Sequence, residues 1–238
     1  NACAKAGECK LAEKWLLKAQ DSGLKPDIIS YTTVINACAK ARERIKAEEL
    51  LTKAIDSGLE PNIRTYNAVA RACASVGKYT TAEMWLSKAM ERGLELDMLS
   101  YNAIITACAK AGEYTRAEVW FARVEEAGLK PDMWIYNSVI SACAKAGNST
   151  QADKWLARAR EAGLKPRLET YAHLLMAYKR SIHLSLEDRI EKVKLLHQSM
   201  MRSGLRPDER FMKSIREMLP SRRFEAFCVD LGIGAQGA

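Results

Sequence analysis

Apolar residues recur along the chain in pairs of short segments, and within each segment they have the spacing of an amphipathic helix. Between Tyr31 and Cys38 the apolar positions fall at i, i+3, i+4 and i+7, which places them on one helical face. The segment from Ala47 to Ala54 repeats this spacing, and so does a later one from Ala117 to Val124. The pattern predicts paired helices over most of the chain and no sheet.

Glycine and proline mark where the predicted helices end. Gly112 and Gly147 follow the first helix of a pair, where a left-handed glycine is common. After the second helix stands Gly-Leu-Lys-Pro-Asp, as in Gly128–Asp132, and proline cannot continue a helix. Each pair therefore closes with its own stop signal.

The helix pairs repeat with a period of 35 residues. Three sets of identical residues share this period: Gly23, Gly58, Gly93, Gly128 and Gly163; Tyr31, Tyr66, Tyr101, Tyr136 and Tyr171; and Cys3, Cys38, Cys73, Cys108 and Cys143. A single pair cannot bury its own apolar faces, so neighbouring pairs must stack. The sequence therefore predicts an all-α solenoid of helix-turn-helix repeats. The tryptophans of the second helices are expected in its core: Trp15, Trp85, Trp120 and Trp155.

Composition agrees with this picture and adds a basic charge. The chain has 238 residues, of which 48% are apolar, and its 13 glycines and 6 prolines are too few for a collagen-like or linker-rich protein. No uncharged apolar run approaches the roughly 18 residues that a membrane span needs, so we expect none. Lys and Arg outnumber Asp and Glu by 37 to 29, a net charge of +8. This excess favours an anionic partner but does not require one.

Cysteines and histidines give no indication of a metal site or of catalysis. Five of the seven cysteines recur once per repeat with no Cys-x-x-Cys pair, and Cys9 has no nearby histidine. His173, His183 and His197 lack the spacing of a zinc pair, and the glycines of 232–237 follow no predicted strand. We expect no metal, no other cofactor and no enzymatic activity. The cysteines expected to be buried, reduced and unpaired are Cys38, Cys73, Cys108 and Cys143.

The repeat resembles a known family. Its first helix is written (S/T)-Y-N-x-(V/I)-I-x-A-C-A-K-A-G, and it closes in G-L-x-P-D, which looks like the pentatricopeptide repeat. The tetratricopeptide repeat has a period of about 34 and a Trp-Leu-Gly signature that this chain lacks. The resemblance implies a right-handed α-solenoid that binds single-stranded RNA in a mitochondrion or plastid. The alternative is a structural subunit of a large organellar complex such as a ribosome, binding mainly protein.

The family's register divides the chain into repeats. The fifth complete repeat carries six extra residues, expected around Ser181–Asp188 between its two helices, and a targeting peptide is expected upstream of Asn1. The expected segments are 1–27, a truncated repeat; 28–62, 63–97, 98–132 and 133–167, complete repeats; 168–208, the irregular repeat; and 209–238, a partial repeat with a capping helix and tail.

The resemblance also implies how RNA bases are read. In the family, the fifth and last residues of a repeat bond to the edge of one base, and the second residues of neighbouring repeats sandwich it. The pairing rules imply adenine for Thr32 with Asn62, and uracil for Asn67 with Asp97 and for Asn102 with Asp132. Asn137 with Arg167 and Ala172 with Asp208 depart from the rules. The sandwiching residues are Ile29, Arg64, Leu99 and Trp134, whereas Glu169 would repel phosphate.

A column of basic residues stands two positions after the cysteine column. Its members are Lys5, Lys40, Lys110, Lys145 and Arg180, with Ser75 in the remaining repeat. A solenoid would align these cations along one face, where they could contact successive phosphates. The simpler interpretation is a solvated cation that complements the dipole at a helix C-terminus. We expect the column as a whole to contact phosphate.

Overall fold

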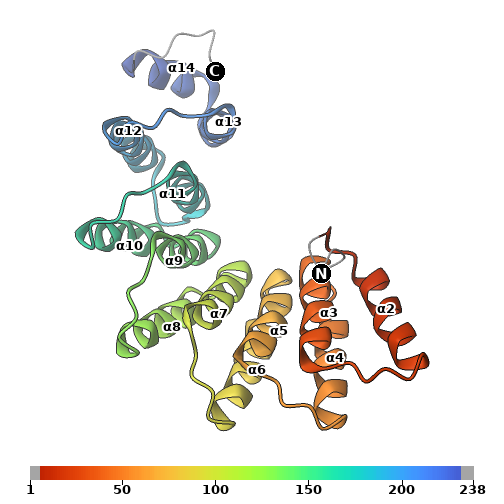
Figure 1. Ribbon diagram of the computed structural model, residues 1–238. Coiled ribbons are helices and arrows are strands. Elements are labelled where there is room, and N and C mark those ends of the chain that lie inside the picture. Colours follow the sequence, from red (N-terminus) through yellow and green to blue (C-terminus); the bar gives the residue numbers. More distant parts are fainter. Residues whose placement is uncertain (1–5, 232–238) are drawn as a thin grey trace. The chain divides into compact units, whose positions relative to one another are not determined.

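The computed structural model describes residues 6–231, and within them the chain forms helices and no strand, which confirms the all-α repeat array (Figure 1). The first helices of the repeats are α3 (Ile28–Lys40), α5 (Ile63–Ser75), α7 (Met98–Ala111), α9 (Met133–Lys145), α11 (Leu168–Arg180) and α13 (Glu209–Met218). The second helices are α2 (Cys9–Asp21), α4 (Arg44–Asp56), α6 (Tyr79–Glu91), α8 (Tyr114–Glu126), α10 (Ser149–Glu161), α12 (Leu186–Arg202) and α14 (Ser221–Asp230). In the described part of the chain no helix is long and apolar enough to cross a bilayer.

The helices form two compact units, one of α2 to α8 and the other of α9 to α14. In the first unit α5 packs between α3 and α7, so first helices lie side by side (Figure 1). In the second unit α11 packs in the same way on α9. Small residues permit this close approach: Ala37, Cys38 and Ala39 of α3 are all buried.

Three second helices, α6, α8 and α10, are each anchored by an aromatic pair with a first helix. Trp85 lies 6.5 Å from the ring of Tyr66, and Trp120 lies 6.2 Å from that of Tyr101. These tryptophans are buried, as expected, but Trp15 is 58% exposed, so the prediction for it was wrong. In the described residues Trp15 has the Lys18 ammonium 5.1 Å from its ring and no recorded aromatic partner.

The turn between the helices of a repeat requires a left-handed residue. Gly147 fills this position with φ 71°, and Gly77 does so with φ 72°. In the repeat that begins at Ile28 the position is held by Arg42, which adopts φ 61° although it has a side chain. The backbone conformation is therefore set by the repeat and not by the presence of glycine.

The cysteines differ from expectation at one place. Cys73, Cys108 and Cys143 are buried and belong to no disulfide among the described residues, as predicted. Cys38, however, forms a disulfide with Cys9, with their Cα atoms 4.7 Å apart, so the prediction that it is unpaired was wrong. Cys9 begins α2, and stacking brings it beside α3. The partner could not be recognised from sequence because the two cysteines lie 29 residues apart.

The six extra residues of the irregular repeat are divided between a loop and a helix. The loop between α11 and α12 has five residues, 181–185, against three in the turn of residues 146–148. Most of the added length extends α12, which has 17 residues where α10 has 13. The sequence had placed the whole insertion between the helices, but the helical pattern continues through most of it.

Candidate nucleic-acid interface

A connected polar cluster joins α5 to the beginning of α7. The Asn67 amide nitrogen donates to Asp97 Oδ1 at 2.9 Å, and the Ser100 hydroxyl donates to Asn67 Oδ1 at 2.7 Å. Asp97 Oδ1 also accepts the backbone N–H of Ser100 at 2.9 Å, which caps α7. The structure therefore brings together the predicted pair Asn67 and Asp97. Asn67 keeps only 4% of its surface exposed.

The predicted pair Thr32 and Asn62 is linked through a third residue. The Thr32 and Thr65 hydroxyl oxygens lie 2.7 Å apart, and Thr65 Oγ1 is 3.3 Å from Asn62 Oδ1. Asn62 is exposed and caps α5 by accepting the backbone N–H of Thr65 at 3.2 Å. Thr65 thus connects the two residues that were expected to read one base.

Of the third predicted pair, Asn102 belongs to the first unit and Asp132 to the second. Asn102 is half-buried on α7, and its Oδ1 is a buried atom with no hydrogen-bond partner. Asp132 is exposed and caps α9 through the backbone N–H of Ile135 at 3.0 Å. Asn102 therefore differs from Asn67, whose oxygen has a donor.

The two pairs that depart from the family's rules lie in the second unit. Asn137 accepts a hydrogen bond from Thr170 Oγ1 at 2.7 Å, as Asn67 does from Ser100, but Arg167 replaces the carboxylate of Asp97. Ala172 is exposed and has no polar side-chain atom, while Asp208 caps α13. These two repeats keep the helices of the repeat, but one lacks the carboxylate at its last position and the other lacks a polar side chain at its fifth position.

The residues expected to sandwich bases are exposed. Ile29 exposes 69% of its surface, Leu99 56% and Trp134 60%, and Arg64 is exposed as well. All four stand at the second position of their repeats, so this exposure recurs at one place in the array. Glu169 also points to solvent and lies 3.7 Å from His173 Nε2, so this repeat offers a carboxylate in place of a stacking surface.

The cationic column contacts the ends of the first helices. Lys110 Nζ donates to the Ser75 carbonyl oxygen at 3.1 Å, and Arg180 donates to that of Lys145 at 3.2 Å. Each cation thus bonds the C-terminal end of the neighbouring first helix. Burial, and then the nearby charge of Arg180, lowers the pKa of Lys145. Lys40 is exposed at the end of α3, and Lys5 lies outside the described residues.

A family model for the pentatricopeptide repeat domain matches residues 2–83, 85–145 and 128–180. The chain belongs to the pentatricopeptide repeat family. None of the curated proteins compared with the chain matches it.

Solved structures agree with this assignment. The pentatricopeptide repeat protein PPR10 from maize is 25% identical with a TM-score of 0.75, over 100% of this chain and 33% of that one. PPR10 in complex with an 18-nt psaJ RNA element is 21% identical with a TM-score of 0.51, over 94% and 38%. The PPR domain of Arabidopsis thaliana protein-only RNase P 1 in complex with tRNA is 14% identical with a TM-score of 0.63, over 77% and 94%. This chain thus spans about a third of the length of maize PPR10.

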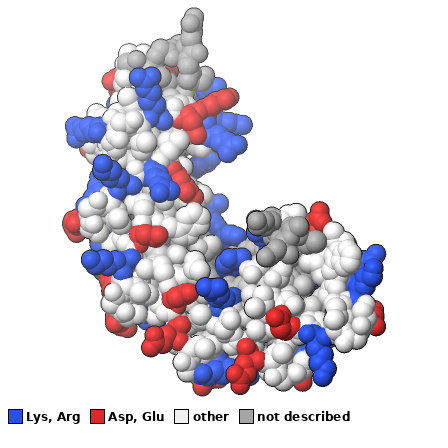
Figure 2. Space-filling view, viewed as in Figure 1, with Lys and Arg blue, Asp and Glu red and all other residues white. Residues whose placement is uncertain are grey.

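Charge is distributed unevenly along this pentatricopeptide repeat chain. Residues 131–238 hold 18 basic and 12 acidic residues, whereas residues 1–130 hold 19 and 17. Figure 2 shows basic side chains in number over α9 to α14 and a closer mixture of both signs over α2 to α8. Most of the net positive charge therefore belongs to the second unit, although the regular Asn67–Asp97 pair lies in the first.

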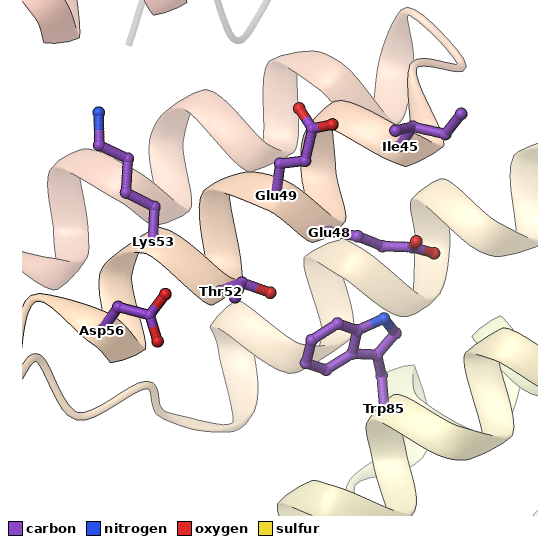
Figure 3. Close-up of a pocket in the computed structure, with 7 residues that line it drawn as sticks. All are labelled: Ile45, Glu48, Glu49, Thr52, Lys53, Asp56 and Trp85. Atoms are coloured by element: carbon purple, nitrogen blue, oxygen red, sulfur yellow. The ribbon is translucent and has the colours of Figure 1, made fainter.

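A groove of about 420 Å³ lies between second helices and not at the predicted interface. Six of its lining residues come from α4, among them Glu48 and Glu49, and Trp85 comes from α6 (Figure 3). Trp85 Nε1 is buried without a hydrogen-bond partner, while Trp120 Nε1 donates to Glu83. The equivalent acceptor for Trp85, Glu48, is engaged by Arg44 at 2.7 Å. None of the residues expected to read bases lines this groove.

Sequence reasoning missed the hydroxyl residues at the third position of the repeats. Thr65, Ser100 and Thr170 are fully buried, and each contacts the fifth residue of the repeat before it. The signal was present, because serine or threonine stands before most of the repeated tyrosines. It was used only as part of the family motif. The contact of this hydroxyl joins one repeat to the next, so it can be recognised only in the stacked helices.

Proposed function

We propose that the chain binds single-stranded RNA, one base per repeat, without enzymatic activity of its own. The observation that carries this proposal is the Asn67 amide held against Asp97 at 2.9 Å, with the exposed second-position residues Arg64 and Leu99 in the same and the next repeat. An amide offers hydrogen bonds to a base edge, and exposed side chains on either side offer stacking surfaces. PPR10, to which the chain is similar, has been solved with an RNA element, which supports the same role here.

The preferred sequence follows from the three regular repeats. The repeats 28–62, 63–97 and 98–132 would select adenine, uracil and uracil by the family's pairing rules. With the amino-terminal repeat towards the 5′ end, as in the family, the run is 5′-A-U-U-3′. Because three bases select weakly, we propose a permissive reader that acts on an organellar transcript, in a mitochondrion or plastid, by binding, stabilising or presenting it for processing.

The test is binding of short single-stranded RNAs across a series of salt concentrations. A 5′-A-U-U-3′ oligonucleotide should bind more tightly than permuted ones, and affinity should fall with salt because cations on the protein release counterions. Asn67→Ala should weaken discrimination at the middle base by about 1–3 kcal/mol. Thr33→Ala, in the repeat 28–62 but outside the reading positions, is the control. No binding at low salt, or unchanged preference in Asn67→Ala, would remove the proposal.

A second candidate function is that of a structural subunit in a large organellar complex, contacting mainly protein. Arg167 and Ala172 at reading positions favour it, since neither offers the amide or carboxylate that the family uses. A ribonucleoprotein subunit would combine the two functions. If no RNA binds the purified chain, this candidate stands alone.

A further inference from the structure

A buried hydroxyl at the third position of a repeat contacts the fifth residue of the preceding repeat in both units. The three pairs, with oxygen atoms 2.7 Å apart in each, are Thr65 with Thr32, Ser100 with Asn67, and Thr170 with Asn137. The partners are 33 residues apart in every case. All three hydroxyl-bearing residues are completely buried, so the contact excludes water. It is a regular feature of how successive first helices pack.

The Ser100 hydroxyl selects one of the two orientations of the Asn67 amide. The Ser100 oxygen already accepts the backbone N–H of Asp97 at 3.2 Å, so its own hydrogen is directed to Asn67 Oδ1, and the acceptor-only carboxylate of Asp97 takes Nδ2. One hydrogen of Nδ2 is used by Asp97, and the other remains for a base. Asn67 can then offer a base a donor through Nδ2, while Ser100 occupies one of the two lone pairs of its oxygen.

In the second unit the hydroxyl acts without the carboxylate. Thr170 donates to Asn137 Oδ1, but the last position of that repeat is Arg167, which has only donors. The hydroxyl contact is thus kept where the carboxylate is lost. It follows that the orientation of the fifth residue does not depend on the last residue alone.

Asn102 provides the opposite case. The third residue of the repeat that follows it is Ile135, which has no hydroxyl. Asn102 Oδ1 is the one amide oxygen at a fifth position that is recorded as buried and unpaired in the described residues. The one fifth-position amide that lacks this hydroxyl in the sequence is thus also the one whose oxygen has no donor in the described part of the chain.

We propose that the third-position hydroxyl is a positioning residue for base recognition: it fixes the amide of the preceding repeat and thereby sets which base edge that repeat accepts. The inference rests on the proposed RNA-binding function and deepens it. Repeats followed by serine or threonine present a fixed donor. The repeat with Asn102, which is followed by Ile135, presents an amide that can turn and therefore discriminates less between uracil and cytosine.

The test compares the affinities of Ser100 variants for two RNAs that differ only at the base assigned to the repeat 63–97. Uracil offers an acceptor at O4 where cytosine offers an amino donor, so a free Asn67 oxygen would accept cytosine. Ser100→Ala should lower the uracil-to-cytosine affinity ratio by at least about fivefold, the lower end of the range for a base-edge contact. Ser100→Thr should keep the ratio, because Thr65 and Thr170 fill the same position.

Controls separate positioning from loss of stability. Val124→Ala removes buried volume from α8, far from the reading positions in the repeat, and should lower the unfolding midpoint while leaving the ratio unchanged. Thr170→Val, made together with Arg167→Asp so that the repeat 133–167 has its carboxylate, keeps the side-chain shape without the hydroxyl and repeats the test at Asn137, so the inference is still decided if Ser100→Ala does not fold.

The outcomes distinguish this inference from the proposed function. RNA binding by the unaltered chain with an unchanged ratio in Ser100→Ala or Thr170→Val would overturn the inference and leave the function. An equal fall of the ratio in Val124→Ala would also overturn it, since lost stability would then be the cause. Absence of binding by the unaltered chain would remove both.

Discussion

First and second helices are joined to their neighbours by different chemistry. Between the first helices α5 and α7 the contact is a buried polar cluster in which Ser100 donates to Asn67 at 2.7 Å. Between the second helices α6 and α8, Trp120 Nε1 donates to Glu83 at 2.6 Å and Arg116 pairs with the same carboxylate at 2.7 Å. The first set orients polar groups at the proposed reading positions, and the second holds large side chains in place. Stability and recognition can therefore be altered separately.

The second unit shows the same division. Tyr136 and Trp155 lie 6.0 Å apart between α9 and α10, and Lys192 of α12 bonds Asp153 of α10 at 2.6 Å. Thr170 meanwhile contacts Asn137 between the first helices. The residues at the reading positions differ between the two units, as Arg167 does from Asp97. In both units, however, the hydroxyl contact joins first helices. The division is thus a property of the repeat, and a change in a second helix should alter stability without altering base preference.

The largest expected effect is on stability, from a second helix. Trp120 is 3% exposed, contacts Tyr101 and lies under the Arg123 guanidinium at 4.3 Å. Trp120→Ala should lower the free energy of unfolding by about 3–5 kcal/mol, measured by urea denaturation. Trp15→Ala, at an exposed site, should change it by less than about 1 kcal/mol. Base preference, measured well below the unfolding midpoint, should be the same in both.

Hydrogen exchange would locate the damage of Trp120→Ala. Because the stability of a repeat array is a sum of repeat and nearest-neighbour contributions, exchange should rise mainly in α7, α8 and the helices packed on them. A uniform rise along the chain would contradict this and would mean that the repeats unfold as one body.

The second effect is a gain of recognition in a first helix. Arg167→Asp should give Asn137 the carboxylate that Asn67 has, because Asp97 bonds both the Asn67 amide and the backbone N–H of Ser100. We expect a new preference for uracil at that repeat of about 1–3 kcal/mol, measured with RNAs varied at one base. Arg167→Ala is the control, since it removes the arginine without adding a carboxylate. The same preference in both variants would show that the carboxylate is not what selects the base.

The third change lies in the turn between the two kinds of helix and should affect stability alone. Arg42 is exposed and has φ 61°, where Gly77 and Gly147 stand in other repeats. A left-handed residue with a side chain costs about 1–2 kcal/mol, so Arg42→Gly should raise the free energy of unfolding by about 1 kcal/mol. Arg42→Ala keeps the β-carbon and should give no such gain. Equal effects of the two would show that the arginine side chain, and not the backbone, is responsible.

The fold could be predicted from sequence because its signals are local or strictly periodic. The spacing of Tyr31 to Cys38 defines one helical face, and the 35-residue period requires that such faces stack. The contacts across the stack could not be read in this way. The bond from Ser100 to Asn67, the disulfide of Cys9 with Cys38 and the exposure of Trp15 all depend on which residue of one repeat meets which residue of the next.

The candidate site was predictable in position but not in geometry. The family's register identified Asn67 and Asp97 as a pair, and the structure has them bonded at 2.9 Å. It did not indicate that Asn67 is almost wholly buried, because burial at this position comes from the neighbouring first helix. Nor did it indicate that Lys110 bonds a carbonyl oxygen, because side-chain reach depends on the stacking distance.

The smallest effect concerns the cationic column, whose residues either contact phosphate or only complement the dipole at a helix C-terminus. Lys110 bonds the Ser75 carbonyl at the end of α5, yet an ammonium has three hydrogens and can donate to a phosphate as well. Lys110→Ala should change the free energy of unfolding by no more than about 0.5 kcal/mol, since the site is exposed.

If Lys110 contacts phosphate, affinity should fall for all RNA sequences alike, and the slope of log affinity against log salt should decrease by about one. Lys53→Ala, on a second helix, should leave that slope unchanged. An unaltered slope in Lys110→Ala would assign the lysine to the helix end alone, and the first helices would then recognise RNA through bases without this phosphate contact.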